Sequence, residues 1–327
     1  MTDMSAAMAK GGAPAPVLRL FGWGMLAILA AYLIENVCVV WLDFQGARAI
    51  LSGGGVAMAA LYLVGLALAA FWVLSSGSTP LRRDAARITA FNAYLIRSLF
   101  WAVFFVGVVD AAIAFVRAEG FLTNFMDAET AILYGQSRFL APTFHAPLIA
   151  LGFVFGLFTR TLGFTWLTLL IVVAELGIVF SRFIFSYEQA LMGDLVRYWY
   201  AALFLFASAY TLLEEGHVRV DVLYAGFSQR AKGRANAIGA ICFGITSCWV
   251  IIAIGFASKT SVINSPISSF EISQTGTSGM YIKYQMAAFL GIFAVTMLIQ
   301  FVSQLFEAVA DIRDEPGRRE PASASAQ

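Results

Sequence analysis

Long apolar runs that end abruptly at charged residues limit most strongly what this chain can fold into. The clearest run is Tyr198–Leu213. The polar cluster that follows it consists of Glu214, Glu215, His217, Arg219 and Asp221. An unpaired charge in bilayer hydrocarbon costs about 2.5–3.5 kcal/mol on insertion scales. These groups must therefore lie at or beyond the lipid headgroups, so the stretch predicts a membrane helix with a polar cluster at its water boundary.

The composition extends this prediction to the whole chain. Of the 327 residues, 60% are hydrophobic and 13% are charged, whereas a soluble domain is about 25% charged. Runs of about twenty apolar residues have the length that a helix needs to cross a bilayer. We therefore expect an all-α integral membrane protein with about eight transmembrane helices. The expected spans are Val17–Leu42, Val56–Leu74, Asn92–Val116, Ala146–Phe158, Phe164–Phe185, Tyr198–Leu213, Ala235–Ala257 and Tyr281–Phe306.

The basic residues decide whether the fourth and fifth apolar runs form a hairpin or one kinked helix. A hairpin puts fourteen of the 21 lysines and arginines on one side of the membrane. Those left on the other side are Arg48, Arg117, Arg138, Arg182, Arg197, Lys259 and Lys283. Because loops rich in lysine and arginine stay in the cytoplasm, we predict the hairpin, with both termini cytoplasmic. The same reasoning treats Arg82, Arg83 and Arg87 as a cytoplasmic loop.

Two other connections have a recognisable character. The long connection from Arg117 to His145 lacks an apolar run that could cross the membrane, so we expect it outside the bilayer and partly helical. Between the fifth and sixth spans, Tyr187, Leu191 and Leu195 recur every four residues. This spacing fits a short helix lying in the interface plane, and an ordinary connecting turn fits equally well.

Ionisable residues inside the predicted spans are candidates for function because a membrane interior makes them costly. Glu35, Asp110 and Glu175 are such residues, and Arg182 lies two turns beyond Glu175 on the same helix face. A proton or cation relay would require them to converge around a wet cavity. Structural pairing within the chain and a polar contact with another subunit are the alternatives.

Other kinds of site find little support in the sequence. The histidines, His145 and His217, are predicted on opposite sides of the membrane, so we expect no metal site, no cofactor and no enzymatic activity. A net charge of +1 with scattered basic residues gives no reason to expect nucleic-acid binding. Cys38, Cys242 and Cys248 are expected to pack as small apolar residues. Gly152-Phe-Val-Phe-Gly156 matches G-x-x-x-G, which permits close helix approach, but a chance match is expected with 28 glycines.

The segment E-E-G-H-V-R-V-D-V-L-Y at Glu214 to Tyr224 resembles the signature of a known transporter family. It follows the second span of a four-span unit and precedes Arg230, Lys232 and Arg234, as in the small permease subunits of TRAP transporters, the DctQ-like family. The segment R-F-I-F-S-Y-E-Q-A-L-M-G-D-L-V-R at 182–197 supports the resemblance. Shorter members often carry a tryptophan-containing acidic stretch there, where this chain has Tyr187, Glu188 and Asp194 instead.

The resemblance covers about residues 162–310 and implies a division of the chain. It implies a flexible tail at 1–16, a four-helix membrane extension at 17–161, a DctQ-like core at 162–310 and a disordered tail at 311–327. It further implies a cation-coupled importer of organic acids or related solutes in the bacterial inner membrane. In such systems a periplasmic solute-binding protein delivers the solute to a large permease subunit, which carries the transport and sodium sites. The small subunit supports and orients the large one among the membrane lipids.

Two hypotheses remain open at the level of sequence. In the first, this chain is the small subunit, and the cluster from Glu214 to Asp221 fixes a loop against a neighbouring subunit. In the second, the chain is a self-contained transporter or channel whose pathway uses Glu35, Asp110 and Glu175.

Overall fold

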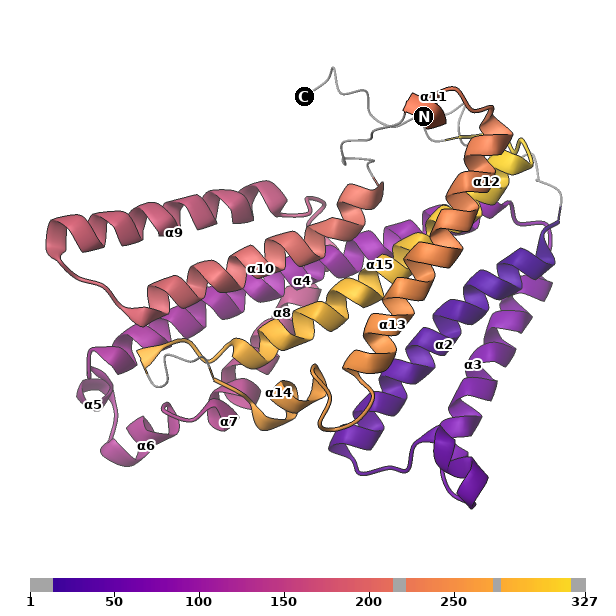
Figure 1. The fold of residues 1–327 in the computed structure, drawn as a ribbon. Helices are drawn as coiled ribbons and strands as arrows, with labels where there is room; N and C mark the ends of the chain where they lie inside the picture. Colours follow the sequence, from indigo (N-terminus) through magenta and orange to yellow (C-terminus); the bar gives the residue numbers. More distant parts are fainter. Residues whose placement is uncertain (1–13, 214–221, 273–277, 319–327) are drawn as a thin grey trace. The chain divides into compact units, whose positions relative to one another are not determined.

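The computed structural model describes residues 14–213, 222–272 and 278–318, and its regular structure is helical throughout these residues (Figure 1). The long helices are α2 (Pro16–Trp41), α3 (Val56–Ser75), α4 (Leu81–Ala118), α8 (Ala146–Phe158), α9 (Phe164–Phe185), α10 (Ala190–Leu213), α12 (Gln229–Gly239), α13 (Thr246–Gly255) and α15 (Lys283–Ile312). The short helices are α5 (Leu122–Phe125), α6 (Ala128–Leu133), α7 (Ser137–Leu140), α11 (Val222–Ala225) and α14 (Asn264–Ser269). A 3₁₀ turn, η1, covers Ala47–Ser52, and π-helical turns cover Ala141–His145 (η2) and Ala240–Ile245 (η3).

Eight helical runs in the described residues are long and apolar enough to cross a membrane. Six are α2, α3, α4, α9, α10 and α15. The other two combine several elements: α7, η2 and α8 form the run Ser137–Phe158, and α12, η3 and α13 form the run Gln229–Gly255. The predicted all-α membrane fold with eight spans is therefore confirmed, whereas the cytoplasmic placement of both termini stays a prediction.

The fourth and fifth spans are two separate helices, as the distribution of basic residues predicted. α8 ends at Phe158, where Thr159 turns to extended backbone, and α9 begins after Gly163. Gly163 has φ of 80°, a left-handed conformation that glycine adopts without a steric penalty. The five residues from 159 to 163 thus break the helix instead of kinking it.

Two predicted connections are wrong because helices begin earlier than expected. The basic residues Arg82, Arg83 and Arg87 lie in the first two turns of α4 and not in a loop. No glycine or proline lies between Leu81 and Val106, so nothing stops the helix from including them. α10 likewise begins at Ala190, which leaves only 186–189 to connect it with α9.

The chain forms two compact units, and neither is continuous in sequence. The first contains Met1–Asn92, Ala209–Ser258 and Ala294–Gln327, and the second contains Ala93–Ser208 and Lys259–Phe293. The chain passes from one unit to the other within α4, α10 and α15, and also in the connection between α13 and α14. Each unit therefore contains residues from both sides of position 161. The predicted extension and core divide the sequence, and their boundary does not coincide with a boundary between the units.

The connection after α4 contains the short helices α5, α6 and α7, in agreement with the expected partly helical loop. Asp127 caps α6, because its carboxylate accepts hydrogen bonds from the backbone N–H and the hydroxyl of Thr130, at 2.9 and 2.8 Å. These bonds lower the pKa of Asp127. His145 was expected in this connection but lies inside the fourth span, in the π turn η2.

Proline explains the π turn that contains His145. Pro147 lies two residues after His145, the last residue of the turn, and has no N–H to donate to the carbonyl oxygen of Thr143. Its ring would also collide with that carbonyl in a regular α-helix, and widening the turn relieves the clash. The wider turn orients the His145 side chain, which is 1% exposed, toward the interior of its unit.

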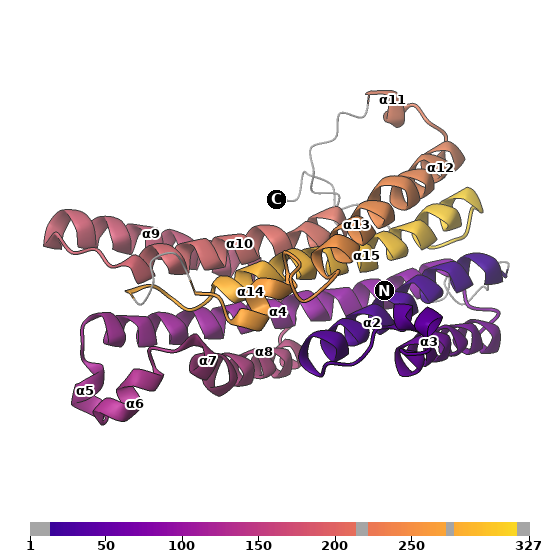
Figure 2. The same ribbon diagram turned by 60° about the horizontal axis from the view of Figure 1, so that its bottom comes forward.

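The G-x-x-x-G match on α8 marks a close helix contact and is not a chance occurrence. A Cβ atom added at Gly152 would lie 2.4 Å from the backbone nitrogen of Ala102 on α4. One added at Gly156 would lie 2.2 Å from the hydroxyl oxygen and 3.0 Å from the Cα of Ser98. α8 consequently packs directly on the backbone of α4 (Figure 2), as small residues allow in membrane helices.

We predict that Gly152→Leu destabilises the protein by about 1–3 kcal/mol or more, because the new side chain meets backbone that cannot rotate away. Thermal unfolding of the purified protein in detergent should show a lower midpoint. Gly177→Leu on α9 is the matched control, since a Cβ there meets nothing within 4 Å. Equal midpoints for the two variants would contradict the close contact.

Candidate functional site

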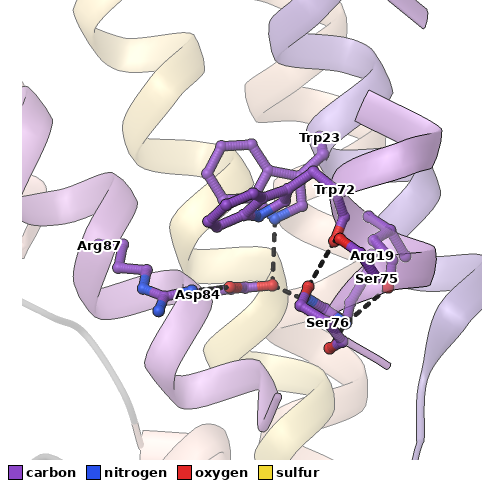
Figure 3. A network of polar contacts seen from close by, with 8 residues as sticks. Arg19, Trp23, Trp72, Ser75, Ser76, Asp84 and Arg87 are labelled. Atoms are coloured by element: carbon purple, nitrogen blue, oxygen red, sulfur yellow. Dashed lines mark hydrogen bonds and ion pairs between the residues drawn. The ribbon is translucent and has the colours of Figure 1, made fainter. Parts of the chain in front are cut away.

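Arg19 of α2 is fully buried and joins three helices (Figure 3). Its Nε donates to Oδ2 of Asp84 in the first turn of α4, at 2.7 Å. Its Nη1 and Nη2 donate to the carbonyl oxygen and the hydroxyl of Ser76, at 2.7 and 2.8 Å, just beyond the end of α3. The last carbonyls of a helix lack intrahelical partners and carry partial negative charge. The guanidinium therefore satisfies the end of α3 and the carboxylate of α4 together.

Two further side chains complete the surroundings of Asp84. Trp23 donates from its indole nitrogen to Oδ2 at 3.1 Å, and Arg87 lies 3.4 Å from Oδ1. The guanidinium of Arg87 also lies 5.5 Å from the ring centroid of Trp72, within range of a cation–π interaction. Trp72 in turn meets Trp23 edge to face. The buried carboxylate of Asp84 thus has several hydrogen-bond donors and lies close to a pair of tryptophan rings.

The first part of α4 pairs with the last part of α15 through buried polar side chains. Asn92 donates from Nδ2 to the carbonyl oxygen of Thr296 at 3.0 Å. One turn away, the hydroxyls of Thr89 and Ser303 lie 2.8 Å apart, and Ser303 also donates to the carbonyl oxygen of Ala85 at 2.9 Å. Positions three or four residues apart share one helix face, so these contacts form a ladder along the two helices.

Arg82 forms the last rung of this α4–α15 ladder. Its side chain is 4% exposed and ion-pairs with Glu307 and Asp311, the latter at 2.7 Å. Its Nε and Nη2 also donate to the carbonyl oxygen of Glu315, at 3.2 and 3.1 Å. The described chain thus continues past α15 with Glu315 buried, although the predicted tail begins at 311.

A second buried network lies in the other unit and is centred on Asp110 of α4. Nε2 of His145 lies 3.0 Å from Oδ1 of Asp110, and the backbone N–H of Tyr281 donates to Oδ2 at 2.8 Å. Nδ1 of His145 lies 2.8 Å from the hydroxyl of Tyr284, whose ring stacks on the imidazole. Asp110 and His145 are each 1% exposed.

The donors in this Asp110 network can be ordered by elimination. The Tyr198 hydroxyl donates to Oε1 of Gln285, so the Gln285 amide nitrogen donates to the Tyr284 hydroxyl at 3.2 Å. The Tyr284 hydroxyl then donates to Nδ1 of His145, which leaves Nε2–H to donate to Asp110. All donors point toward the carboxylate, and aligned hydrogen bonds strengthen one another where water is excluded. In this order every hydrogen bond of the network has one donor and one acceptor.

Neighbouring contacts hold the segment that precedes α15. The backbone N–H of Met280 donates to Oδ2 of Asp194 at 3.1 Å. The Arg117 guanidinium lies 3.9 Å from the ring centroid of Tyr281 and donates to the carbonyl oxygen of Tyr134 at 3.2 Å. Burial raises the pKa of Tyr281, and the charge of Arg117 acts in the opposite direction. The start of α15 is thereby fixed from three directions.

The three intramembrane carboxylates predicted from sequence have separate surroundings. Asp110 belongs to the network just described. Glu35 accepts hydrogen bonds from the backbone N–H of Ala47, at 2.6 Å, and from the hydroxyl of Tyr62, so it holds the turn between α2 and α3. Glu175 lies exposed on α9, and no described residue pairs with it. Asp110 and Glu175 share no contact within their unit.

Of the remaining predicted residues, the structure describes Arg182, whereas the polar cluster lies outside the described part of the chain. Arg182 lies 3.3 Å from Glu188, and both side chains are more than half exposed. It therefore pairs outward and not with Glu175. The cluster Glu214, Glu215, His217, Arg219 and Asp221 lies outside the described residues.

Within residues 14–213, 222–272 and 278–318, no group of three or more histidine, cysteine, aspartate or glutamate side chains could hold a metal ion. The cysteines are free: Cys248 is buried, Cys38 is partly buried and Cys242 is exposed. Most of the buried polar groups described above instead pair with one another, although Oδ1 of Asn92, Nε2 of Gln300 and the carboxylate oxygens of Glu315 have no hydrogen-bond partner among the described residues. What this arrangement can do chemically is hold helices in register.

Residues 168–310 match the family described as tripartite ATP-independent periplasmic transporters, DctQ component. This part of the chain is a DctQ component domain. Comparison with curated proteins and with solved structures gives no match. The DctQ component belongs to the inner membrane, in agreement with eight membrane-length helices, and the protein is a multi-pass inner-membrane protein. The helices before residue 168 are those of a long variant.

The two networks attach this N-terminal part to the DctQ domain. In one unit, Asn92 and Arg82 of the N-terminal part bind Gln300 and Glu307 of the domain. In the other unit, Asp110 and His145 bind Tyr281 and Tyr284. The early helices are thus built into the same compact units as the DctQ domain and are not a separate module.

Sequence analysis missed most of these residues, although a signal for some was present. Arg82, Ala85, Thr89 and Asn92 follow a three-to-four-residue spacing without a helix breaker, which predicts one polar helix face. The charges of Arg82, Arg83 and Arg87 concealed it by suggesting a loop. Nothing in the sequence around Arg19 indicated a partner 65 residues away.

We predict that Asp84→Asn and Arg19→Met each destabilise the protein by about 3–5 kcal/mol, because each leaves a buried charge without its counterion. The double variant Arg19→Met/Asp84→Leu should lose less than the sum. Thermal unfolding in detergent gives the double-mutant cycle. Arg182→Met removes an exposed ion pair and should cost no more than about 1 kcal/mol. Additive losses at Arg19 and Asp84 would contradict the pairing.

We also predict a ranked series in the Asp110 network. Asp110→Asn should be the most destabilising change, because it removes the charge toward which the donors point and introduces a competing amide. Tyr284→Phe should cost about 1–3 kcal/mol, since it leaves buried polar atoms of His145 and Gln285 unsatisfied. Tyr187→Phe, which removes a hydroxyl bound to Glu119, should cost least. An Asp110→Asn variant that unfolds like the wild type would disprove the ordering of donors.

Proposed function

We propose that this protein is the small membrane subunit of a TRAP-type, cation-coupled secondary importer of organic acids or related solutes. It supports and orients a large permease subunit, which receives the solute from a periplasmic binding protein. The observation that carries the proposal is the DctQ match over residues 168–310, which spans the last four membrane helices. Sodium is the coupling ion that we propose.

The chemistry of the described residues supports a structural role. Buried ionisable groups bind other parts of the same chain. Asp110 binds His145 and Tyr281, and Arg19 binds Asp84. A transport pathway requires polar groups that can exchange partners with a solute or an ion. The inward-facing polar groups of the two networks already bind one another, so we place the route of the solute in the large subunit.

The helix surfaces support a lateral partner. In the most apolar 18-residue stretch of each helix, 11% is buried in α3 and in α9, against 50% in α15. Apolar area of this kind fits lipid or another membrane protein. We propose that the polar cluster from Glu214 to Asp221 fixes its loop against the same large subunit, as the family signature suggests.

Co-purification tests the proposal directly. The tagged chain is co-expressed with a large TRAP permease subunit from the same organism and isolated in mild detergent. We expect a stable complex of the two subunits, and sodium-dependent uptake into proteoliposomes only when both subunits and the binding protein are present. A chain that purifies alone under these conditions, or that transports solute without the large subunit, would contradict the proposed function.

A further inference from the structure

Among the membrane-length helices of its unit, α9 is the least buried. It lies along α10 with its other side open (Figures 1 and 2). Only Leu167 and Ile171 of its 22 residues are buried. Val172 and Val179, on the side adjoining these two, are 49% and 47% exposed. Between Thr168 and Arg182 this side is apolar apart from one group, which lies near the middle of the helix.

That group is Glu175, the twelfth residue of the helix, about midway between its ends. The side chain is exposed, and no residue in the described part of the chain pairs with it. Arg182 would be the natural partner by spacing but binds Glu188 instead. A carboxylate that faces lipid at the middle of a span is among the costliest placements in a membrane protein.

A shallow, open hollow lies on the same side of α9. It is lined by residues of this helix alone: Phe164, Thr165, Thr168, Leu169 and Val172. Thr168 and Val172 are seven and three positions before Glu175, so they share its face. The helix therefore presents a recess followed by a carboxylate along one stripe, a shape and charge that another helix could match.

We infer that the Glu175 side of α9 is the docking surface for a transmembrane helix of the large permease subunit that carries a lysine or arginine at the middle of the membrane. This inference rests on the proposed function and specifies the contact. Lipid tails offer no cation or hydrogen-bond donor at this depth. A second copy of this chain, docked through the same stripe, would bring another Glu175 to it, and like charges repel there. Charge complementarity therefore selects a cationic partner helix.

The experiment uses the co-expressed two-subunit complex and measures how much large subunit the tagged chain retains. Glu175→Lys should reduce retention by about tenfold or more, because it places like charges at a desolvated contact. Glu175→Gln should retain more than Glu175→Lys, since an amide can still bind the donor. Exchanging the matching mid-membrane lysine or arginine of the large subunit for glutamate should restore retention with Glu175→Lys.

Val173→Lys is the matched control. It puts the same cation at nearly the same depth on another exposed face of α9, where Val173 is 57% exposed, and should leave retention unchanged. A photo-crosslinking residue at Val172 should form an adduct with the large subunit. An adduct with a second copy, no adduct in an intact complex, or equal retention by Glu175→Lys and wild type would overturn the inference.

The two proposals fail in distinguishable ways. If the wild-type chain retains no large subunit, the proposed function is wrong and so is the inferred docking surface. If the wild type retains the large subunit while the Glu175 series behaves like the wild type, only the docking surface is wrong. Thermal unfolding of each variant shows whether a loss of retention comes from misfolding.

Discussion

A polar side chain buried in a membrane helix must find its partner inside the protein, because lipid supplies none. This constraint organises the protein around α4. Polar residues in its first three turns are bound to other helices, beginning with Arg82 and Asp84 and continuing to Asn92, and Asp110 is bound further along. Apolar packing holds the remaining surfaces, but it discriminates little between one register and another. The polar contacts select one, since a shift by a single residue would leave several of them unsatisfied.

The same constraint accounts for the relation between the early helices and the DctQ domain. Arg82, Thr89 and Asn92 of α4 are matched by residues of α15, which lies within the family match for most of its length. In the other unit, Asp110 of α4 binds Tyr281, just before α15 and also within the family match. Within each unit, the helices before residue 168 thus supply polar partners to residues of the DctQ domain.

The difference between Asp110 and Glu175 separates internal structure from interaction. Both are carboxylates within membrane helices, and sequence treats them alike. Asp110 has both oxygens occupied and is 1% exposed, whereas Glu175 faces outward among apolar side chains. A group that the fold satisfies stabilises the fold, and a group that the fold leaves open on a lipid-facing helix requires something from outside. The second situation points to a partner protein.

The sequence by itself determined that this is an all-α membrane protein with eight spans, because hydrophobic length and charge interruptions are local properties of the chain. It also indicated the family through the segment from Glu214 to Tyr224. Only the tertiary structure decided that Arg19 binds Asp84, that His145 lies inside a span, and that Gly152 packs on Ala102. Each of these depends on residues distant in sequence being brought together, and helix periodicity shows which face is polar without showing what lies opposite. That pairing is set by how the helices pack.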